Sequence, residues 1–424
     1  MAAILAINGG PPIRTRQWPK WPVWNRNTLK SLHRVLLKGR WTISGPYTGY
    51  PAIEQEFARR FASFNRCKYC VPTANGSSSL LIALESLNVG CGDEVIVPGL
   101  TWVATASSIL NANARPVFVD IDPDSLSMSV NDLRKNITSK TRAIILVHLY
   151  CSVNDMDEIS KIARDLKIPI IEDCSHVHGS EWRHRRVGTL GALGCFSMQQ
   201  SKVLTSGEGG AVITNKLELF LRLEQLRSDG RRFVRRPEIG RMELIASGKI
   251  MGGNYCLSEF HSAVLMDQLG RLERQNAIRE ANAKYLDAKL SRLGGLTPVR
   301  RFGQVNKQSY YQYAVKYNPE SFCRRPLSVV CKALEAELGL QFARTYPPMN
   351  QNPLFRPRSK RRYTWTAKHL QSKITLQGAK SVHRNFITFH HSALLGERRD
   401  MDDIVFAFAK IQRDSGQLPW SVAQ

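Results

Sequence analysis

The stretch Ala143-Ile144-Ile145-Leu146-Val147-His148-Leu149-Tyr150 is followed, after one amphipathic segment, by Ile168-Pro169-Ile170-Ile171-Glu172-Asp173-Cys174. Both stretches are short apolar runs, and Met156–Leu166 between them has the apolar spacing of a helix. Strands that are buried on both faces are apolar throughout instead of alternating. This strand–helix–strand unit therefore predicts a parallel sheet with helices on both sides.

The same alternation extends in both directions from this unit, which indicates an α/β fold. An amphipathic helix is predicted from Pro51, and the polar loop Asn75–Ser79 opens a second one. Further strands are predicted at Tyr69–Pro72, Glu94–Pro98, Pro116–Ile121, Gly194–Met198 and Gly210–Thr214, and further helices at Val103–Asn111 and Val130–Ile137.

The last third of the chain has a different pattern. A long helical stretch over Ser258–Leu293 is broken by Gly294-Gly295-Leu296-Thr297-Pro298. Beyond it we expect a smaller α+β domain, with a strand at Ser309–Val315 and helices at Leu327–Leu338 and Asp402–Gln412. We therefore predict an N-terminal arm (1–50), a large domain (51–293) and a small C-terminal domain (294–424).

Composition excludes several classes of protein. The 424 residues are 43% hydrophobic and 22% charged, which is ordinary for a globular protein and unlike disordered or collagen-like chains. No stretch approaches the roughly 18 continuous apolar residues of a membrane helix. The segment Met1–Asn8 lacks the basic start of a secretory signal, and nine scattered cysteines favour a reducing compartment. We expect a cytoplasmic protein with no membrane partner.

The net charge of +25 is the one unusual property of the composition. Basic residues cluster at Arg183–Arg186, over Arg227–Arg236 and over Arg356–Arg362. Each cluster is either solvated surface or a contact for an anionic ligand. A nucleic-acid partner is not expected, because no aromatic-interleaved signature or zinc-finger spacing accompanies the clusters. Cys67 and Cys70 form a lone CxxC pair, which does not predict a metal site.

Four polar segments stand where predicted strands end, and ligands of open α/β sheets bind at that edge. Each has an ordinary alternative interpretation. Asn75–Ser79 is either a phosphate site at a helix N-terminus or a simple cap. Asp173 is either a site residue or a loop anchor, Trp102 either stacks on a flat ligand or fills the core, and Lys202 is either a buried nucleophile or solvated.

Taken together, the four segments predict one cofactor site. A phosphate cradle, a stacking aromatic ring, an acid and a buried lysine are the groups that bind pyridoxal 5'-phosphate. Ser197, at the end of the strand before Lys202, adds a hydroxyl for the phosphate. Asp173 and Lys202 are separated by 29 residues that include one predicted strand.

The chain resembles the sugar and cyclitol aminotransferases of the aspartate-aminotransferase superfamily, fold type I. The resemblance extends over essentially the whole chain. It is carried by Asn75-Gly76-Ser77, Thr101–Thr105, Val147–Tyr150, Glu172-Asp173, Lys202 with Gly207-Glu208-Gly209-Gly210, and Gly253-Asn254-Tyr255. Gln199–Thr205 and the pair His390-His391 resemble the branch that aminates scyllo-inosose and 2-deoxy-scyllo-inosose for aminocyclitol antibiotics.

The resemblance implies a role for each matching residue. Lys202 would carry the cofactor and move protons, and Asp173 would bind the pyridine nitrogen. Trp102 would stack on the ring, His176 would contact the phenolic oxygen, and Gly76, Ser77, Ser78 and Ser197 would hold the phosphate. Asn254 would reach the phosphate of a neighbouring subunit, which implies a homodimer with shared sites. The residues expected near substrate are Tyr150, Arg231, Arg344, His390 and His391.

The implied reaction is ping-pong transamination of a keto-cyclitol or keto-sugar, with L-glutamine or L-glutamate as amino donor. A nucleotide-linked keto-sugar is an alternative substrate, with Arg231 or Arg344 near the diphosphate. Cys256 argues mildly against it, because many nucleotide-sugar enzymes carry a basic residue there. A noncatalytic polyanion-binding relative is a further alternative. A metal site at His176, His178 and Cys174 is not expected.

Overall fold

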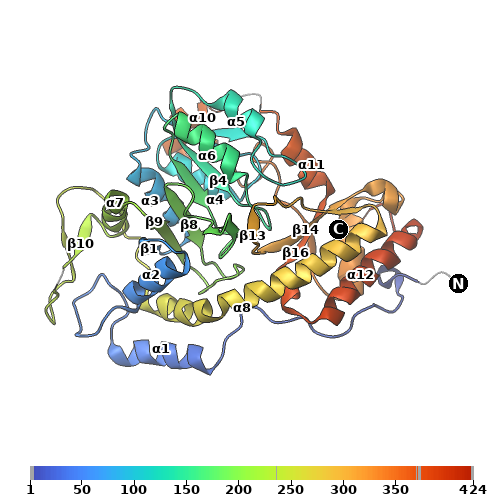
Figure 1. Cartoon of the computed structure of the whole chain (residues 1–424), viewed down its shortest axis with the longest axis horizontal. Coiled ribbons are helices and arrows are strands. Elements are labelled where there is room, and N and C mark those ends of the chain that lie inside the picture. Colours follow the sequence, from blue (N-terminus) through green and yellow to red (C-terminus); the bar gives the residue numbers. More distant parts are fainter. Residues whose placement is uncertain (1–3, 235, 369, 371–373, 422–424) are drawn as a thin grey trace.

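A computed structural model describes residues 4–234, 236–368, 370 and 374–421. Its centre is a seven-stranded sheet in the order β1-β9-β8-β5-β4-β2-β3. Figure 1 labels β1, β4, β8 and β9 of this sheet. The strands are β1 (Tyr69–Thr73), β2 (Glu94–Pro98), β3 (Arg115–Val119), β4 (Thr141–Val147), β5 (Ile170–Asp173), β8 (Leu193–Ser197) and β9 (Gly210–Thr214). Strands β3, β2, β4, β5 and β8 are parallel, and β9 is antiparallel to both of its neighbours.

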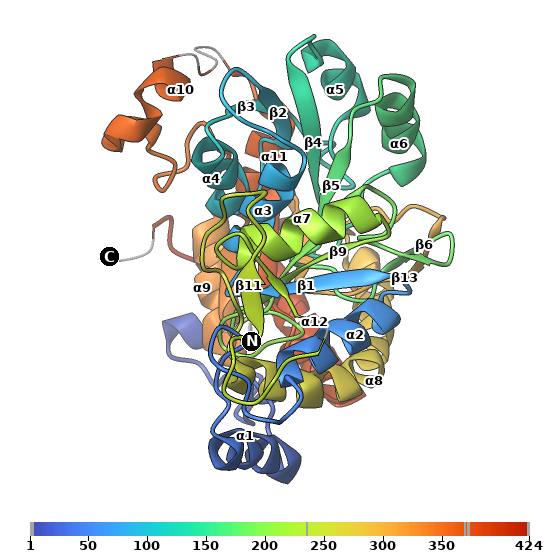
Figure 2. The same cartoon turned by 90° about the vertical axis from the view of Figure 1, so that its left-hand side faces the viewer.

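The sheet has a hydrophobic core on each face, as its continuous apolar strands predicted. In β4, Ala143, Ile145 and Val147 face one core, whereas Ile144 and Leu146 face the other. The helices that precede and follow the strands along the chain cover these two faces (Figure 2). They are α2 (Ile53–Phe64), α3 (Gly76–Ser86), α4 (Val103–Asn111), α5 (Val130–Asn136), α6 (Met156–Asp165) and α7 (Leu217–Arg227).

Helix α8 (Glu259–Leu290) crosses the molecule and connects the central sheet to a second, four-stranded antiparallel sheet (Figure 1). This sheet has the order β12-β14-β16-β15. Its strands are β12 (Leu296–Pro298), β14 (Gln312–Tyr317), β15 (Phe342–Arg344) and β16 (Phe386–His390). The helices in this part of the chain are α9 (Leu327–Leu338), α10 (Thr364–Lys368), α11 (Gln377–Asn385) and α12 (Arg398–Arg413). We propose the division into a large domain (51–293) and a small one (294–424), with 1–50 as an arm.

The remaining elements are short. They are the strands β6 (Glu181–Trp182), β7 (Arg185–Arg186), β10 (Arg231–Phe233), β11 (Leu244–Ala246) and β13 (Val305–Lys307), and the 3-10 turns η1 (Ala6–Asn8), η2 (Ser291–Leu293), η3 (Pro319–Phe322), η4 (Pro357–Ser359), η5 (Arg361–Tyr363), η6 (Ala393–Leu395) and η7 (Ser415–Gln417). Within the described residues, no helix combines the length and apolar character needed to cross a membrane.

The α/β class is confirmed, but several predicted boundaries differ from the structure. The strand predicted to reach Tyr150 ends at Val147, because the chain turns there and Tyr150 adopts a left-handed backbone with φ of 56°. The strand predicted at Ser309–Val315 lies at Gln312–Tyr317, and the last helix begins at Arg398 instead of Asp402. Helix α1 (Arg26–Lys38) was not predicted, because Leu29, Leu36 and Leu37 are exposed and do not mark a buried face.

Arginines of the basic clusters are not all on the surface. Arg227 is completely buried and forms an ion pair with Glu54, and Arg186 is buried between the Gly179 carbonyl and Glu273. Arg183, in contrast, is exposed and pairs with Asp157. Arg235 lies outside the described residues. The interpretation of these clusters as solvated surface is therefore wrong for Arg227 and Arg186, whose charges are neutralised inside the protein.

Candidate active site

A cavity of about 580 Å³ lies where the strands β4, β5 and β8 end. This size is typical of small-molecule sites. Its walls come from all four segments predicted at the strand ends and from the second sheet region. The lining residues are Asn75, Gly76, Ser77, Leu80, Thr101, Trp102, Ala104, Thr105, Val147, Asp173, Ser175, His176, Ser197, Gln199, Ser201, Lys202, Glu208, Tyr311 and Tyr346.

One end of the cavity is the N-terminus of helix α3. Asn75 caps the helix, and its Oδ1 accepts a hydrogen bond from the Ser78 amide at 2.8 Å. The amides of Gly76 and Ser77 have no acceptor among the described residues, as expected for the first turn of a helix. A Cβ atom on Gly76 would lie 2.6 Å from Cβ of Ser197, so only glycine allows this approach. The result is a concave site for an anion.

Asp173 is held rigidly beside the cavity. It is 5% exposed, and its Oδ2 accepts a hydrogen bond from Thr105 Oγ1 at 3.0 Å. Its Oδ1 accepts from the Ser175 hydroxyl at 2.6 Å and from the Ser175 amide at 3.2 Å. These donors bind both oxygens of the carboxylate and fix its direction. Thr105 and Ser175 were not singled out from the sequence as its partners, although Thr105 belongs to the quoted Thr101–Thr105 motif.

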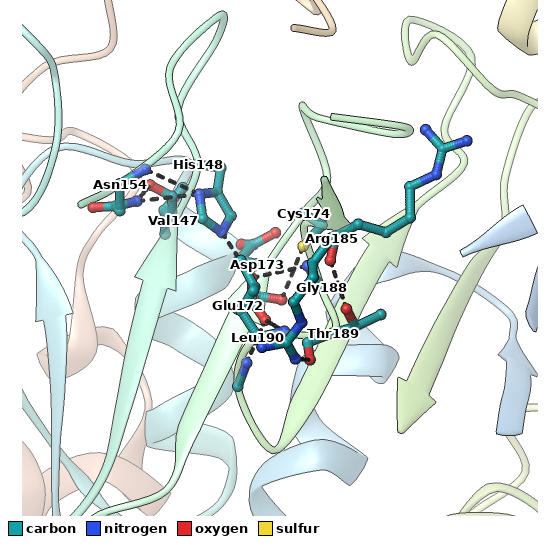
Figure 3. Close-up of polar contacts among 12 residues, drawn as sticks. Val147, His148, Asn154, Glu172, Asp173, Cys174, Arg185, Gly188, Thr189 and Leu190 are labelled. Atoms are coloured by element: carbon teal, nitrogen blue, oxygen red, sulfur yellow. Dashed lines mark hydrogen bonds and ion pairs between the residues drawn. The ribbon is translucent and has the colours of Figure 1, made fainter. Parts of the chain in front are cut away.

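Glu172, the neighbour of Asp173, lies in a separate buried network shown in Figure 3. Its Oε1 accepts hydrogen bonds from the amides of Leu190 and Gly191, and its Oε2 accepts from Gly188 at 2.8 Å. His148 Nδ1 accepts from the Asn154 amide at 3.2 Å, which leaves Nε2, 3.3 Å from Glu172 Oε2, to donate. The network anchors the loop after β7 to β5.

This network also contains a possible metal-ligand set, with His148, Glu172 and Cys174 within 4.8 Å of one another (Figure 3). Because Glu172 already accepts three backbone hydrogen bonds, and His148 and Cys174 have protein partners, the set is satisfied without an ion. His176 and His178 do not join Cys174 in any such group among the described residues.

Lys202 stands in the loop between β8 and β9 and is 9% exposed. Burial lowers the pKa of its amine from 10.5 to about 7, although the nearby Asp173 carboxylate acts in the opposite direction. Its Nζ lies 3.9 Å from the ring centroid of Tyr311. At neutral pH a large fraction of this amine is therefore unprotonated, and a neutral amine is a nucleophile.

Aromatic side chains form another part of the cavity wall. The Trp102 ring is 47% exposed and lies 5.5 Å from Tyr346. His176 is stacked 4.1 Å from Tyr311, and its Nδ1 accepts a hydrogen bond from the Tyr150 amide at 3.1 Å. Burial holds the pKa of His176 well below its usual value, so the ring is neutral with its proton on Nε2. Tyr311 and Tyr346 were not predicted as site residues, because no local sequence pattern links them to the strand ends.

The structure brings Gly76, Ser77, Trp102, Asp173, His176, Ser197 and Lys202 together around one cavity. Ser78 is not in the wall, since its hydroxyl donates to the Asn75 carbonyl at 2.8 Å. Asn254 is exposed and lies outside the cavity wall, and its Oδ1 accepts a hydrogen bond from the Cys256 amide.

The five residues expected near substrate also lie outside the cavity wall. Tyr150 is buried behind it, and its hydroxyl accepts a hydrogen bond from the Tyr346 amide at 2.8 Å. Arg231, the first residue of β10, pairs with Asp229, and Arg344 is exposed on β15. His390 and His391 contact the loop of Lys202 from behind, each with Nε2 3.0 Å from the Ser201 carbonyl.

Comparison with known proteins identifies the family of this chain. Residues 24–386 match the family described as DegT/DnrJ/EryC1/StrS aminotransferases. The chain belongs to this aminotransferase family. The match covers the whole central sheet and every residue that lines the cavity of this aminotransferase.

Two curated relatives of this aminotransferase are similar over nearly their whole length. The L-glutamine:2-deoxy-scyllo-inosose aminotransferase of Streptoalloteichus tenebrarius is 48% identical, over 99% of this chain and 100% of the relative. The L-glutamine:scyllo-inosose aminotransferase of Streptomyces griseus is 46% identical, over 97% and 98%. Among solved structures, 3-amino-5-hydroxybenzoic acid synthase superposes with a TM-score of 0.80 at 25% identity, covering 95% of this chain and 99% of the other.

Proposed function

We propose that this aminotransferase uses pyridoxal 5'-phosphate and that the cavity holds it. The amides of Gly76 and Ser77 and the hydroxyl of Ser197 bind the phosphate at the positive end of helix α3. Asp173, oriented by Thr105 and Ser175, holds a proton at the pyridine nitrogen. Trp102 covers the ring, and Nε2 of His176 donates to the phenolic oxygen. When bound, the cofactor accepts the electrons of the bond that breaks at the substrate carbon.

Lys202 is the reacting side chain in this proposal. Its lowered pKa supplies a neutral amine that attacks a carbonyl carbon at physiological pH. The same amine then takes a proton from one carbon and returns it to another, as a general base and acid with a pKa near the working pH. Burial of Lys202 beneath the aromatic wall excludes water from this proton transfer.

We further infer that the amino acceptor is a keto-cyclitol of the scyllo-inosose type and that L-glutamine is the donor. The relatives named for these substrates support this assignment through their identity over nearly the whole chain. The cavity wall supports it independently: among the described residues of this chain, Lys202 is the only cation in the wall, and Arg231 and Arg344 lie elsewhere. A neutral polyol suits this wall better than a nucleotide diphosphate. The product would be an aminocyclitol of the antibiotic type, made in the cytoplasm.

Direct assays test the assignment. The purified enzyme, loaded with pyridoxal phosphate, is incubated with L-glutamine or L-glutamate and with scyllo-inosose, 2-deoxy-scyllo-inosose or a nucleotide-linked keto-sugar. We expect amination of an inosose with L-glutamine and loss of turnover in Lys202→Ala. Preference for the nucleotide-linked keto-sugar would overturn the substrate assignment, and full activity of Lys202→Ala would overturn the assignment of the active site.

We also propose a homodimer in which each subunit completes the site of the other. Two surfaces with large exposed apolar side chains support it. The segment around β10 and β11 exposes Ile239 and Met251 by 75% and 94%, and helix α1 exposes Leu37 by 75%. Asn254, next to the first of these surfaces, is exposed and free to reach a partner's phosphate site.

Mixing two inactive variants tests the shared site. Lys202→Ala supplies an intact Asn254, whereas Asn254→Leu supplies an intact Lys202. After subunit exchange, mixed dimers contain one complete site, so about a quarter of the parent activity should return. Recovery of no activity, with mixed dimers demonstrated by mass spectrometry, would show that Asn254 acts within its own subunit. Full activity of Asn254→Leu alone would show that Asn254 is not needed.

A further inference from the structure

The two carbonyl groups that immediately precede Lys202 are held by side chains from distant parts of the chain. Trp21 Nε1 donates to the Gln200 carbonyl at 2.9 Å. Nε2 of His390 and Nε2 of His391 each lie 3.0 Å from the Ser201 carbonyl oxygen. These contacts join residues 179 to 190 positions apart in the sequence. A carbonyl oxygen has two lone pairs, so Ser201 satisfies both imidazoles at once.

The hydrogen-bond partners determine where each imidazole carries its proton. His390 Nδ1 accepts from the Ser392 amide at 3.3 Å, so its proton is on Nε2. His391 Nδ1 has no partner among the described residues, and the ring is completely buried. Burial and the nearby Arg279 guanidinium hold the pKa of His391 well below its usual value, so the ring is neutral. Its single N–H is therefore available for the Ser201 carbonyl through Nε2.

The three rings support one another mechanically. His391 lies 4.6 Å from Trp21 in an edge contact and 4.1 Å from His390. Arg279 of α8, completely buried, packs with its guanidinium 5.2 Å from the Trp21 ring. The N-terminal segment that carries Trp21 is itself fixed, because Arg14 pairs with Asp400 and Asp403 at 2.7 Å each. We call Trp21, His390 and His391 the ring clamp.

The ring clamp acts on the side of the loop that faces away from the cavity. Ser201 and Lys202 line the cavity with their side chains, and the Ser201 hydroxyl lies 3.2 Å from the Tyr311 hydroxyl. The peptide between Ser201 and Lys202 is therefore held from behind by two imidazoles, while the amine of Lys202 rests above Tyr311 in front. Rotation of this peptide would move Nζ away from its place in the cavity.

We propose that Trp21, His390 and His391 are positioning residues that aim the Lys202 amine by fixing the two carbonyls before it. The proposal rests on the proposed function for the importance of Lys202, but the clamp itself is tested without any turnover. It assigns the histidine pair a different role from the substrate contact that the sequence predicted.

Hydrogen–deuterium exchange of the cofactor-loaded enzyme measures the clamp directly. The Lys202 amide donates to the Gln199 carbonyl at 2.8 Å, so its exchange reports whether this loop opens. Loss of one neutral hydrogen bond in His390→Leu, His391→Leu or Trp21→Phe should speed exchange of the peptide containing Lys202 by about 5- to 10-fold. His390→Gln keeps a donor near the Nε2 position and should restore most of the protection.

Two further readouts separate positioning from general destabilisation. kcat should fall in the three variants while KM for the ketone stays within about twofold, because the cavity wall is intact. Tyr317→Phe is the matched control, since the Tyr317 hydroxyl also donates to a buried carbonyl, that of Arg325 at 2.6 Å, in the same sheet. This control should leave both the exchange of the Lys202 peptide and kcat unchanged.

Unchanged exchange in the two leucine variants and in Trp21→Phe, or an equal effect of Tyr317→Phe, would overturn the proposal. Trp21→Phe keeps a half-buried ring and removes only the N–H group, so it remains informative if a leucine variant does not fold. Failure of the proposed function is a different result: Lys202→Ala would then retain turnover, whatever the exchange measurement shows.

Discussion

At the scale of single residues, the site depends on one buried amine and one buried carboxylate, and the surroundings of these two groups act on their charges in opposite ways. Asp173 is surrounded by donors that stabilise its charge, whereas Lys202 lies in an apolar setting that penalises its charge. Burial is the larger influence on Lys202, because its pKa falls despite the presence of Asp173. The protein thereby gains an amine that is reactive at neutral pH, and the burial of this amine lowers the free energy of unfolding.

Replacement of Lys202 should therefore raise the free energy of unfolding in a way that depends on pH. The folded pKa of about 7 lies below the ordinary 10.5, so the unfolded chain binds a proton between these values that the folded chain does not. The destabilisation is therefore complete below pH 7 and disappears as the pH rises through 10.5. Lys202→Met should stabilise the cofactor-free protein by a few kcal/mol at pH 6 and by little near pH 10. Denaturant unfolding at both pH values measures this, and a gain that is independent of pH would contradict it.

Thr105 offers a test of the carboxylate. Thr105→Val removes one donor to the charged Asp173 while keeping a similar shape, which should weaken cofactor binding by about tenfold. Ser108→Ala is the control, because the Ser108 hydroxyl donates to the Thr105 carbonyl on the same helix at 2.9 Å and does not contact Asp173. Titration with pyridoxal phosphate, followed by absorbance, should separate the two. Equal affinities of Thr105→Val and Ser108→Ala for pyridoxal phosphate would show that Ser175 alone orients Asp173.

At the scale of elements, the N-terminus of α3 combines two functions that substitution can separate. Asn75 caps the helix and also lines the cavity. Asn75→Asp should keep the cap and the melting temperature but weaken phosphate binding, because it places a negative charge beside the anion site. Asn75→Ala should lower stability by about 1 kcal/mol through loss of the cap. Thermal melts and cofactor titrations of both variants test this, and tighter cofactor binding by Asn75→Asp would refute the phosphate assignment.

The same scale explains which elements were predictable. Helix α3 and strands β4 and β5 follow local patterns, namely a capping residue before an apolar periodic run and continuous apolar strands. Helix α1 and strands β15 and β16 were not predicted. The exposed leucines of α1 do not mark a buried face, and the two strands become recognisable only because β16 pairs with both β15 and β14.

At the scale of the whole molecule, the net charge of +25 acts as self-repulsion, even though many arginines pair locally. Raising the ionic strength from about 0.01 M to about 0.15 M shortens the screening length from roughly 30 Å to roughly 8 Å. We therefore expect the melting temperature to rise over this range, equally in two salts of the same ionic strength. A fall in the melting temperature would mean that attractive ion pairs outweigh the repulsion between like charges. Nucleic-acid binding that persists at the higher ionic strength in cofactor-free protein would support the alternative of a polyanion-binding relative.

The sequence by itself determined the α/β class and the four segments whose side chains meet at the strand ends, because strand and helix periodicity, caps and the right order of elements are local properties. It could also place Asp173 at the end of one strand and Lys202 in the loop after another. Only the tertiary structure decided that Tyr311 and Tyr346 complete the cavity and that Trp21, His390 and His391 lie behind Lys202. These contacts join segments that are far apart in the chain. A local sequence pattern does not contain the information about which distant side chain will pack against a given carbonyl.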